Sequence, residues 1–175
     1  MTHPLQSHSG WFWPLATLTW EVMAALHAVD PEPKGILAFE FAGDWATARQ
    51  ILTEWGEAGR IRAGVSLGLD YLFLVLYSTA IALACLWAAG RLPHPALGVA
   101  LAWAQWVAAG FDASENAALL AILLGARQGP WPQLARRCAA VKFVLIGSGT
   151  LYALGGLIAA ASFEAAALTA RIRKQ

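Results

Sequence analysis

The sequence predicts an all-α fold, an integral membrane four-helix bundle with a short interfacial amphipathic helix between spans one and two. Hydrophobic residues make up 58% of the 175 positions and charged residues only 13%, whereas a typical soluble domain carries about 25% charged residues. The mean hydropathy is +0.53. The apolar residues gather into runs of about 18 or more, which is the length that a helix needs to cross a bilayer.

The first predicted span covers residues 10–29. It ends before Pro31 and Pro33, because proline cannot continue the helical hydrogen-bond ladder. We do not expect a cleaved signal peptide here, since Glu21 interrupts the apolar run and the first 30 residues contain no Lys or Arg. The segment that follows, residues 34–64, is too polar to cross a membrane.

A short helix is predicted inside that polar segment, over residues 45–55. Asp44 is a suitable N-cap and Gly56 ends the helix. Apolar residues recur in it at helical spacing, which predicts an amphipathic helix lying at the membrane interface. These residues are Ala48, Ile51, Leu52 and Trp55.

The other three predicted spans cover residues 65–89, 96–124 and 133–162. Turns containing Pro93, Pro95 and Gly129-Pro130 separate them, and residues 164–175 form a basic tail, predicted as a fraying helical end. No Pro/Gly/Ser-rich linker divides the chain, so residues 1–175 are expected to form one transmembrane domain. Tryptophans should mark the two membrane faces. The predicted groups are Trp11, Trp13 and Trp87 at one face and Trp45, Trp55 and Trp131 at the other.

Charge limits the classes of partner and the orientation. The formal charge of +1 includes no dense Lys/Arg patch, so no nucleic-acid partner is expected. Basic residues are more frequent in loops one and three than near Arg91, which favours a cytoplasmic position for these loops and an external position for both termini. The basic tail, with Arg171, Arg173 and Lys174, favours the opposite orientation.

Cysteine and histidine give no sign of a bridge or a metal centre. Cys85 and Cys138 fall near opposite ends of the predicted spans, so no disulfide is expected. The four histidines are scattered along the chain, and no metal site is firmly predicted.

Ionisable residues inside the predicted spans are the main functional observation. Glu21 lies in the first span, Asp70 in the second, Asp112 and Glu115 in the third and Lys142 in the fourth. At about 1.5 Å of rise per residue, all lie in the membrane half nearer loops one and three. A charge at the bilayer centre costs about 2.5–3.5 kcal/mol. These groups are therefore expected to face one another around a polar cavity that opens toward those loops.

The spacing of these residues permits such a cavity. Asp112, Glu115 and Asn116 share one helical face, and Asp70 and Tyr77 share a face of the second span. One lysine cannot neutralise four acids, so the excess must be protonated, hydrated or bound to a cation. Asn116, Tyr77 and one lysine–acid pair could instead serve only to join helices. The predicted ligand- or cation-binding set is Asp70, Asp112, Glu115, Asn116, Lys142, Glu21 and Tyr77.

Three functional hypotheses fit this pattern. The first is a protein that binds a cation or a small or lipidic ligand, as a transporter or sensor. The second is an intramembrane enzyme acting on a lipid or isoprenoid, with the carboxylates as metal ligands or as general acid and base. The third is an accessory or assembly subunit of a membrane complex. No catalytic motif is present, no cofactor is predicted, and membrane lipids are the expected surroundings.

Several short segments resemble a family of small, uncharacterised bacterial four-span membrane proteins. They are Phe39-Glu40-Phe41-Ala42-Gly43, Leu69-Asp70-Tyr71-Leu72-Phe73, Asp112-Ala113-Ser114-Glu115-Asn116-Ala117-Ala118-Leu119, Trp131-Pro132-Gln133-Leu134 and Lys142-Phe143. The resemblance covers the chain from Gly35 to Tyr152. It implies an integral protein of the bacterial cytoplasmic (inner) membrane and implies no activity.

Overall fold

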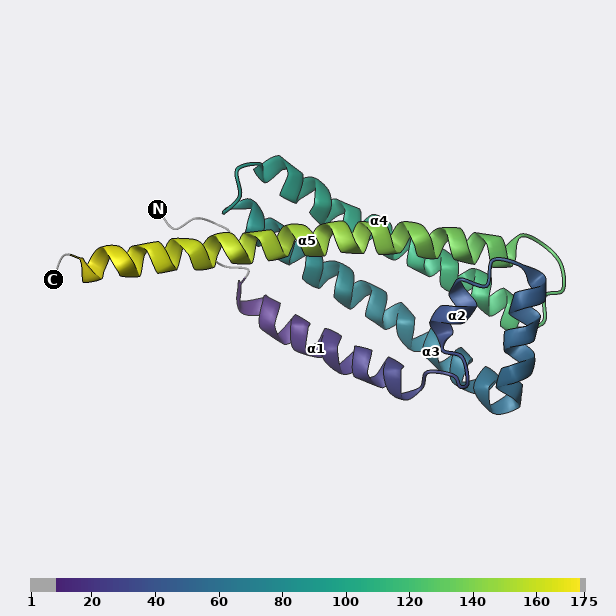
Figure 1. The fold of residues 1–175 in the computed structure, drawn as a ribbon. Helices are drawn as coiled ribbons and strands as arrows, with labels where there is room; N and C mark the ends of the chain where they lie inside the picture. The colour runs from purple at the N-terminus through teal and green to yellow at the C-terminus, as the bar shows by residue number, and fades with distance from the viewer. Residues whose placement is uncertain (1–8, 174–175) are drawn as a thin grey trace.

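The computed structural model describes residues 9–173, with the side chains of residues 12–163, 165 and 173. Its regular elements are the helices α1 (Ser9–Ala28), α2 (Ile36–Glu40), α3 (Trp45–Ala89), α4 (Pro95–Leu123) and α5 (Trp131–Ile172), as Figure 1 shows. Within the described residues, three helical segments are long and apolar enough to cross a membrane: Trp45–Ala89, Pro95–Leu123 and Trp131–Phe163. The regular structure of the described residues is thus entirely helical, and the length and apolarity of three helical segments are consistent with an integral membrane protein.

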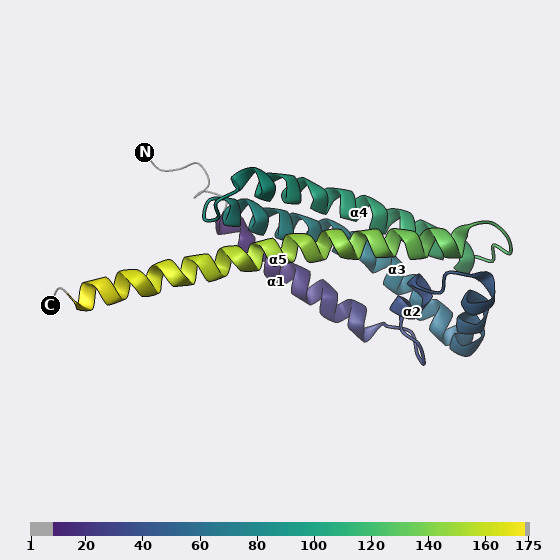
Figure 2. The ribbon, with the colours of Figure 1, turned by 45° about the horizontal axis from the view of Figure 1, so that its top comes forward.

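The long helices α3, α4 and α5 pack along one another, and α1 packs against α3 (Figures 1 and 2). Two glycines of α5 lie in close contact with neighbouring helices. A Cβ atom added to Gly156 on α5 would lie 2.4 Å from the Cβ of Ala88 on α3, and one added to Gly149 would lie 2.3 Å from Nε2 of Gln105 on α4. Glycine at these two positions therefore allows the helices to approach closely.

Helix α3 consists of two helical parts joined at Gly56, whose backbone has φ 59° and ψ −157°. The first part begins at Trp45 with Asp44 as its N-cap, as the sequence predicts. The Thr47 amide donates to Oδ1 of Asp44 at 2.8 Å, and the Thr47 hydroxyl donates to Oδ2 at 2.9 Å. These bonds favour the charged carboxylate and hold the pKa of Asp44 below its usual range. In Figure 1 this first part runs across one end of the long helices.

The apolar face of the 45–55 segment is buried in the protein. Ala48 and Ile51 are buried in one hydrophobic cluster with Leu119 of α4 and Ala135 of α5. The apolar side of the segment therefore packs against one end of the long helices. Its apolar residues contact protein at the positions where the sequence pattern predicted contact with a membrane surface.

The tryptophans near this end are held by specific contacts. Trp55 is 4% exposed and packs edge-on against Phe39, with 5.1 Å between ring centroids, and its indole N–H donates to the carbonyl of Lys34. Trp55 is therefore a core residue. The indole N–H of Trp45 donates to the carbonyl of Gly129 at 2.9 Å, which joins the start of α3 to the loop between α4 and α5.

Helix α5 continues past residue 162, where the sequence predicted the last span to end, and reaches Ile172. Its last turns project beyond the other helices (Figures 1 and 2). The predictions that concern the side chains of Trp11, Arg171 and Lys174 lie outside the described side chains.

Candidate functional site

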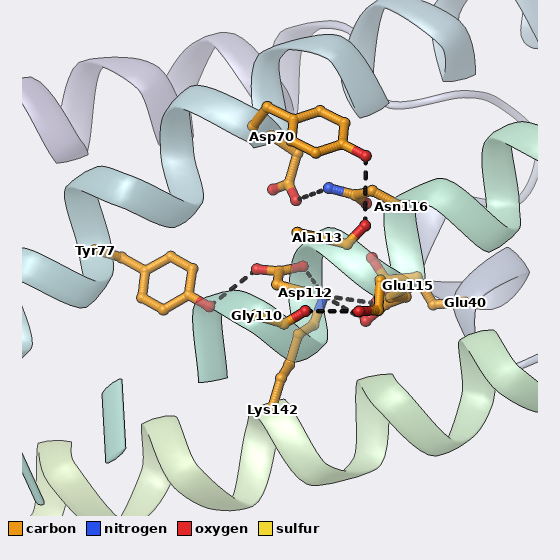
Figure 3. Close-up of polar contacts among 11 residues, drawn as sticks. Glu40, Asp70, Tyr77, Gly110, Asp112, Ala113, Glu115, Asn116 and Lys142 are labelled. Carbon is orange, nitrogen blue, oxygen red and sulfur yellow. Dashed lines mark hydrogen bonds and ion pairs between the residues drawn. The ribbon is translucent and has the colours of Figure 1, made fainter. Parts of the chain in front are cut away.

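A buried ammonium group on α5 holds three carboxyl groups together. Nζ of Lys142 lies 2.8 Å from Oδ1 of Asp112, 2.9 Å from Oε2 of Glu115 and 3.6 Å from Oε2 of Glu40. Of these three contacts, only the one with Asp112 is also a hydrogen bond. Figure 3 shows how the carboxyl groups converge on it. The contacts join α2, α4 and α5 at one point of the fold.

Asp112 is the carboxylate of this cluster whose oxygens both have partners. Oδ1 accepts from Lys142 at 2.8 Å, and Oδ2 accepts from the Tyr77 hydroxyl of α3 at 3.0 Å. The side chain is almost fully buried. Asp112 and Lys142 therefore form a neutral ion pair with additional hydrogen bonding, which is the condition under which a buried pair is tolerated.

Glu115 and Glu40 are held less completely. Glu115 is 0% exposed, and neither of its carboxyl oxygens has a hydrogen-bond partner. Its 2.9 Å contact with Lys142 is close enough for an ion pair but is not aligned as a hydrogen bond. Oε2 of Glu40 is also buried without a hydrogen-bond partner. Unpartnered buried carboxylate oxygens are energetically costly, so these two side chains are the least stabilised acids of the cluster.

A second polar pair lies beside the lysine cluster. The side-chain amide of Asn116 donates to Oδ2 of Asp70 at 2.6 Å, which joins α4 to α3. Asn116 is buried, whereas Asp70 is half-buried. Asn116 follows Glu115 directly and stands four residues after Asp112. Helix α4 therefore carries the Asn116 amide and the carboxyl groups of Asp112 and Glu115 on one face.

A cavity of about 240 Å³ lies between α1, α2, α3 and α4. Its lining combines acidic or polar groups with apolar walls. The polar and titratable residues are His27, Asp30, Glu40, Ser66, Asp70 and Asn116, and the apolar residues are Met23, Leu26, Ile36, Leu37 and Leu67. Glu40 belongs to the cavity and also contacts Lys142, so it connects the cavity to the buried cluster.

The position of Glu40 follows from the way the segment before α3 folds. Oδ1 of Asp30 accepts a hydrogen bond from the Ile36 amide at 2.8 Å, which satisfies a free N–H at the start of α2. Gly35 leaves room for this carboxylate, because a Cβ atom at this position would lie 2.4 Å from Oδ2 of Asp30, which would then have to move. At the other end of α2, Phe39 is 1% exposed. Its burial anchors the short helix and brings the next residue, Glu40, to Lys142.

The structure brings together most, but not all, of the residues predicted as a site. Four of them are in direct contact, namely Tyr77, Asp112, Glu115 and Lys142, and Asp70 and Asn116 form the neighbouring pair. Glu21 is exposed on α1 and does not line the cavity. The sequence interpretation missed Glu40. The signal that could have identified it is its place in a short apolar helix, between Phe39 and Phe41.

Among the described residues, no group of three or more His, Cys, Asp or Glu side chains is arranged to hold a metal ion. Cys85 and Cys138 are both free and buried.

Comparison with protein-family models, with curated proteins and with solved structures finds no match for this chain. The function is therefore inferred from the geometry of the site.

Proposed function

We propose that this chain is a four-span protein of the bacterial cytoplasmic membrane whose acidic cavity binds a small organic cation, as a transporter or a sensor. The bacterial location rests on the sequence resemblance. The cation-binding role rests on the charge and lining of the cavity, and the membrane location on the helices and their outward faces.

The outward faces of the helices support a location in lipid. Trp13 of α1, Trp103 of α4 and Leu151 of α5 are 73%, 71% and 72% exposed. A soluble protein rarely leaves large contiguous apolar surfaces in water. Hydrocarbon chains would cover such faces without cost, because lipid tails are as apolar as these side chains.

Helix α1 is proposed as the fourth span. Its 20 residues rise about 30 Å at 1.5 Å per residue, which matches the hydrocarbon core of a bilayer. The hydroxyl groups of Thr17 and Thr19 donate to the carbonyls of Trp13 and Leu15, so neither polar group needs water. The exposed Glu21 counts against this assignment, because a charged side chain at the membrane centre costs about 2.5–3.5 kcal/mol.

The orientation proposed from the positive-inside rule places the 45–55 segment at the cytoplasmic face, with both termini outside. The exposed side of that segment carries Arg49, whose guanidinium donates to the carbonyl of Arg127 at 3.0 Å and lies 5.5 Å from the ring centroid of Trp45. The segment would then lie among lipid headgroups with its polar side outward.

The observation that carries the proposed function is the pair of carboxyl groups, Glu40 and Asp70, on one apolar-walled cavity. Asp30 adds a third acid to the lining. The acidic residues of the lining attract a positive charge, and its apolar residues provide contacts for the organic part of the ligand. The volume of about 240 Å³ falls just below the ~300–1,000 Å³ of pockets for drug-sized ligands, so the expected ligand is small.

Thermal unfolding of the purified protein in an uncharged maltoside detergent tests this proposal. Choline serves as a probe with a fixed positive charge, and 3,3-dimethylbutan-1-ol is its neutral counterpart of the same shape. At a concentration one hundred times its Kd, a ligand stabilises by about 2.7 kcal/mol. The melting temperature should then rise by roughly 5–10 °C with choline and should not rise with the alcohol.

Two variants make the test specific for the cavity. Asp70→Asn should lose the stabilisation by choline, because it removes a carboxylate from the cavity lining. Glu21→Gln should retain it, because Glu21 is exposed and outside the lining. Equal responses to choline and the alcohol, or an unchanged response in Asp70→Asn, would contradict the proposal. Stabilisation by anionic lipid alone would favour a lipid-directed role in its place.

A further inference from the structure

The proposed cation site leaves two buried carboxyl groups without a complete set of partners. Asp112 and Lys142 neutralise each other, and both oxygens of Asp112 are hydrogen-bonded. Glu115 is fully buried with two unpartnered oxygens, and Glu40 has one. Both contact the same ammonium group, Glu115 at 2.9 Å and Glu40 at 3.6 Å. One ammonium cannot balance three carboxylates in a region from which water is largely excluded.

We propose that Glu40 and Glu115 together hold one proton and release it when a cation binds in the cavity, so that the protein exchanges a proton for its cationic ligand. This inference rests on the proposed cation site and adds the ion to which binding is coupled. Glu40 transmits the exchange, because it lines the cavity and also contacts Lys142.

The exchange balances in charge and in atoms. Before binding, the proton is bonded to a carboxyl oxygen of Glu40 or Glu115. When a monovalent cation enters beside Asp70 and Glu40, its charge takes the place of the proton. The O–H bond breaks, both electrons stay on the carboxylate, and the proton passes to water in the cavity. The net charge of the site stays the same, so the cation does not add an uncompensated charge within the membrane.

Other charged or titratable groups face this pair from every neighbouring helix. Asp112 on α4 and Lys142 on α5 form the neutral pair, and Tyr77 on α3 donates to Asp112. Asp70 on α3 accepts from Asn116. His27, on α1, and Asp30, just after it, line the far side of the cavity. Both oxygens of Asp112 already accept hydrogen bonds, from Tyr77 and Lys142, whereas neither oxygen of Glu115 accepts one.

The experiment measures proton release and choline affinity on the wild-type protein in maltoside detergent. Choline has no titratable group, so any proton released comes from the protein. In weakly buffered solution with a pH-sensitive dye, about one proton should appear for each choline bound. Over the pH range in which the pair holds its proton, choline affinity should rise about tenfold for each unit of pH.

Variants locate the proton. Glu115→Gln should still bind choline, but with no proton release and with an affinity that no longer changes with pH. Glu40→Gln should weaken choline binding, because Glu40 lines the cavity, and the choline that binds at higher concentration should release no proton; this provides a second variant if Glu115→Gln fails to fold. Glu57→Gln, which removes an exposed carboxylate on α3 away from the cluster, should behave as the wild type does.

The possible results separate this inference from the proposed function. If the wild type does not bind choline, the proposed cation site fails and the proton exchange fails with it. If the wild type binds choline without releasing a proton, the cation site stands and the exchange is overturned. Proton release that persists unchanged in both Glu115→Gln and Glu40→Gln would also overturn the assignment to this pair.

Discussion

Lys142 determines whether three carboxyl groups can be buried at one point of the bundle. It contacts Asp112, Glu115 and Glu40, and its side chain is only 7% exposed. We expect Lys142→Met to lower the free energy of unfolding by about 3–5 kcal/mol, because it leaves buried charges without a partner. Thermal unfolding in detergent measures the loss.

Lys34 provides the matched control for that substitution. It forms an ion pair of 2.9 Å with Glu54, but the two side chains are 41% and 31% exposed. Such surface pairs contribute about 0–1 kcal/mol, so Lys34→Met should change the melting temperature little. If Lys142→Met lowers the melting temperature no more than Lys34→Met does, the contacts of Lys142 with the three carboxyl groups do not stabilise the fold.

Single residues also show where sequence reasoning reached the site and where it did not. The spacing of Asp112, Glu115 and Asn116 defines one helical face, and the structure places all three on the inner side of α4. Glu21 was expected beside them because its depth along the first span is similar, but depth does not determine the rotation of an apolar helix about its axis. Glu40 could not be placed, because its segment returns to the bundle only through the burial of Phe39.

At the scale of elements, the bend at Gly56 sets the position of the 45–55 segment. Its φ of 59° and ψ of −157° lie in a region that is essentially restricted to glycine, where other residues cost about 1–3 kcal/mol. A Cβ atom at this position would meet nothing within 4 Å. We therefore expect Gly56→Ala to destabilise the protein by that amount through backbone strain alone, measured by thermal unfolding.

Gly68 is the control for this prediction. It lies within the second part of α3, and a Cβ atom added there also meets nothing within 4 Å. Its backbone is helical, so Gly68→Ala should be neutral or stabilising by about 0.5–1 kcal/mol. A similar loss of stability in both variants would mean that the strain at Gly56 is not the cause.

Adjacent glycines on α5 test the close approach of α5 to α3. In Gly156→Ala the new Cβ atom would lie 2.4 Å from the Cβ of Ala88, whereas in Gly155→Ala the nearest atom, Cδ1 of Leu92, would be 3.8 Å away. We expect Gly156→Ala to cost about 1–3 kcal/mol, the usual cost of overpacking, and Gly155→Ala to cost little. The difference between the two melting temperatures is the measurement, and equal values would contradict this packing.

Helix positions were more predictable than helix contacts. Apolar runs and turn residues located the helices that became α1, α4 and the second part of α3, because these signals are local. Four small residues on α5, Gly147, Gly149, Gly155 and Gly156, are equally suited to close helix packing by residue type alone. Only Gly149 and Gly156 lie against a neighbouring helix, since which side of α5 faces inward depends on the tertiary arrangement.

For the whole molecule, the outward apolar faces and the inward ion cluster are two parts of one arrangement. Lipid would cover residues such as Trp103 and Leu151, and the charged groups meet inside, where Lys142 compensates part of their charge. The helices α3, α4 and α5 satisfy the length and apolarity that spanning requires. The path of α1 determines whether the cavity, which α1 lines through Met23 and Leu26, lies within the membrane.

The number of spans has a direct consequence for the two termini. Four spans place both ends of the chain on one side of the membrane, and three spans, with α1 outside the bilayer, place them on opposite sides. We expect both ends on the same side, together with Arg91, and Lys34 and Arg127 on the other. Membrane-impermeant reagents can probe short epitope tags at each end of the chain. The same reagents can probe single cysteines at these three loop positions, in a protein whose buried Cys85 and Cys138 are replaced by Ala. Tags that react from opposite sides would show that α1 does not cross, and the cavity beside it would then face water or headgroups.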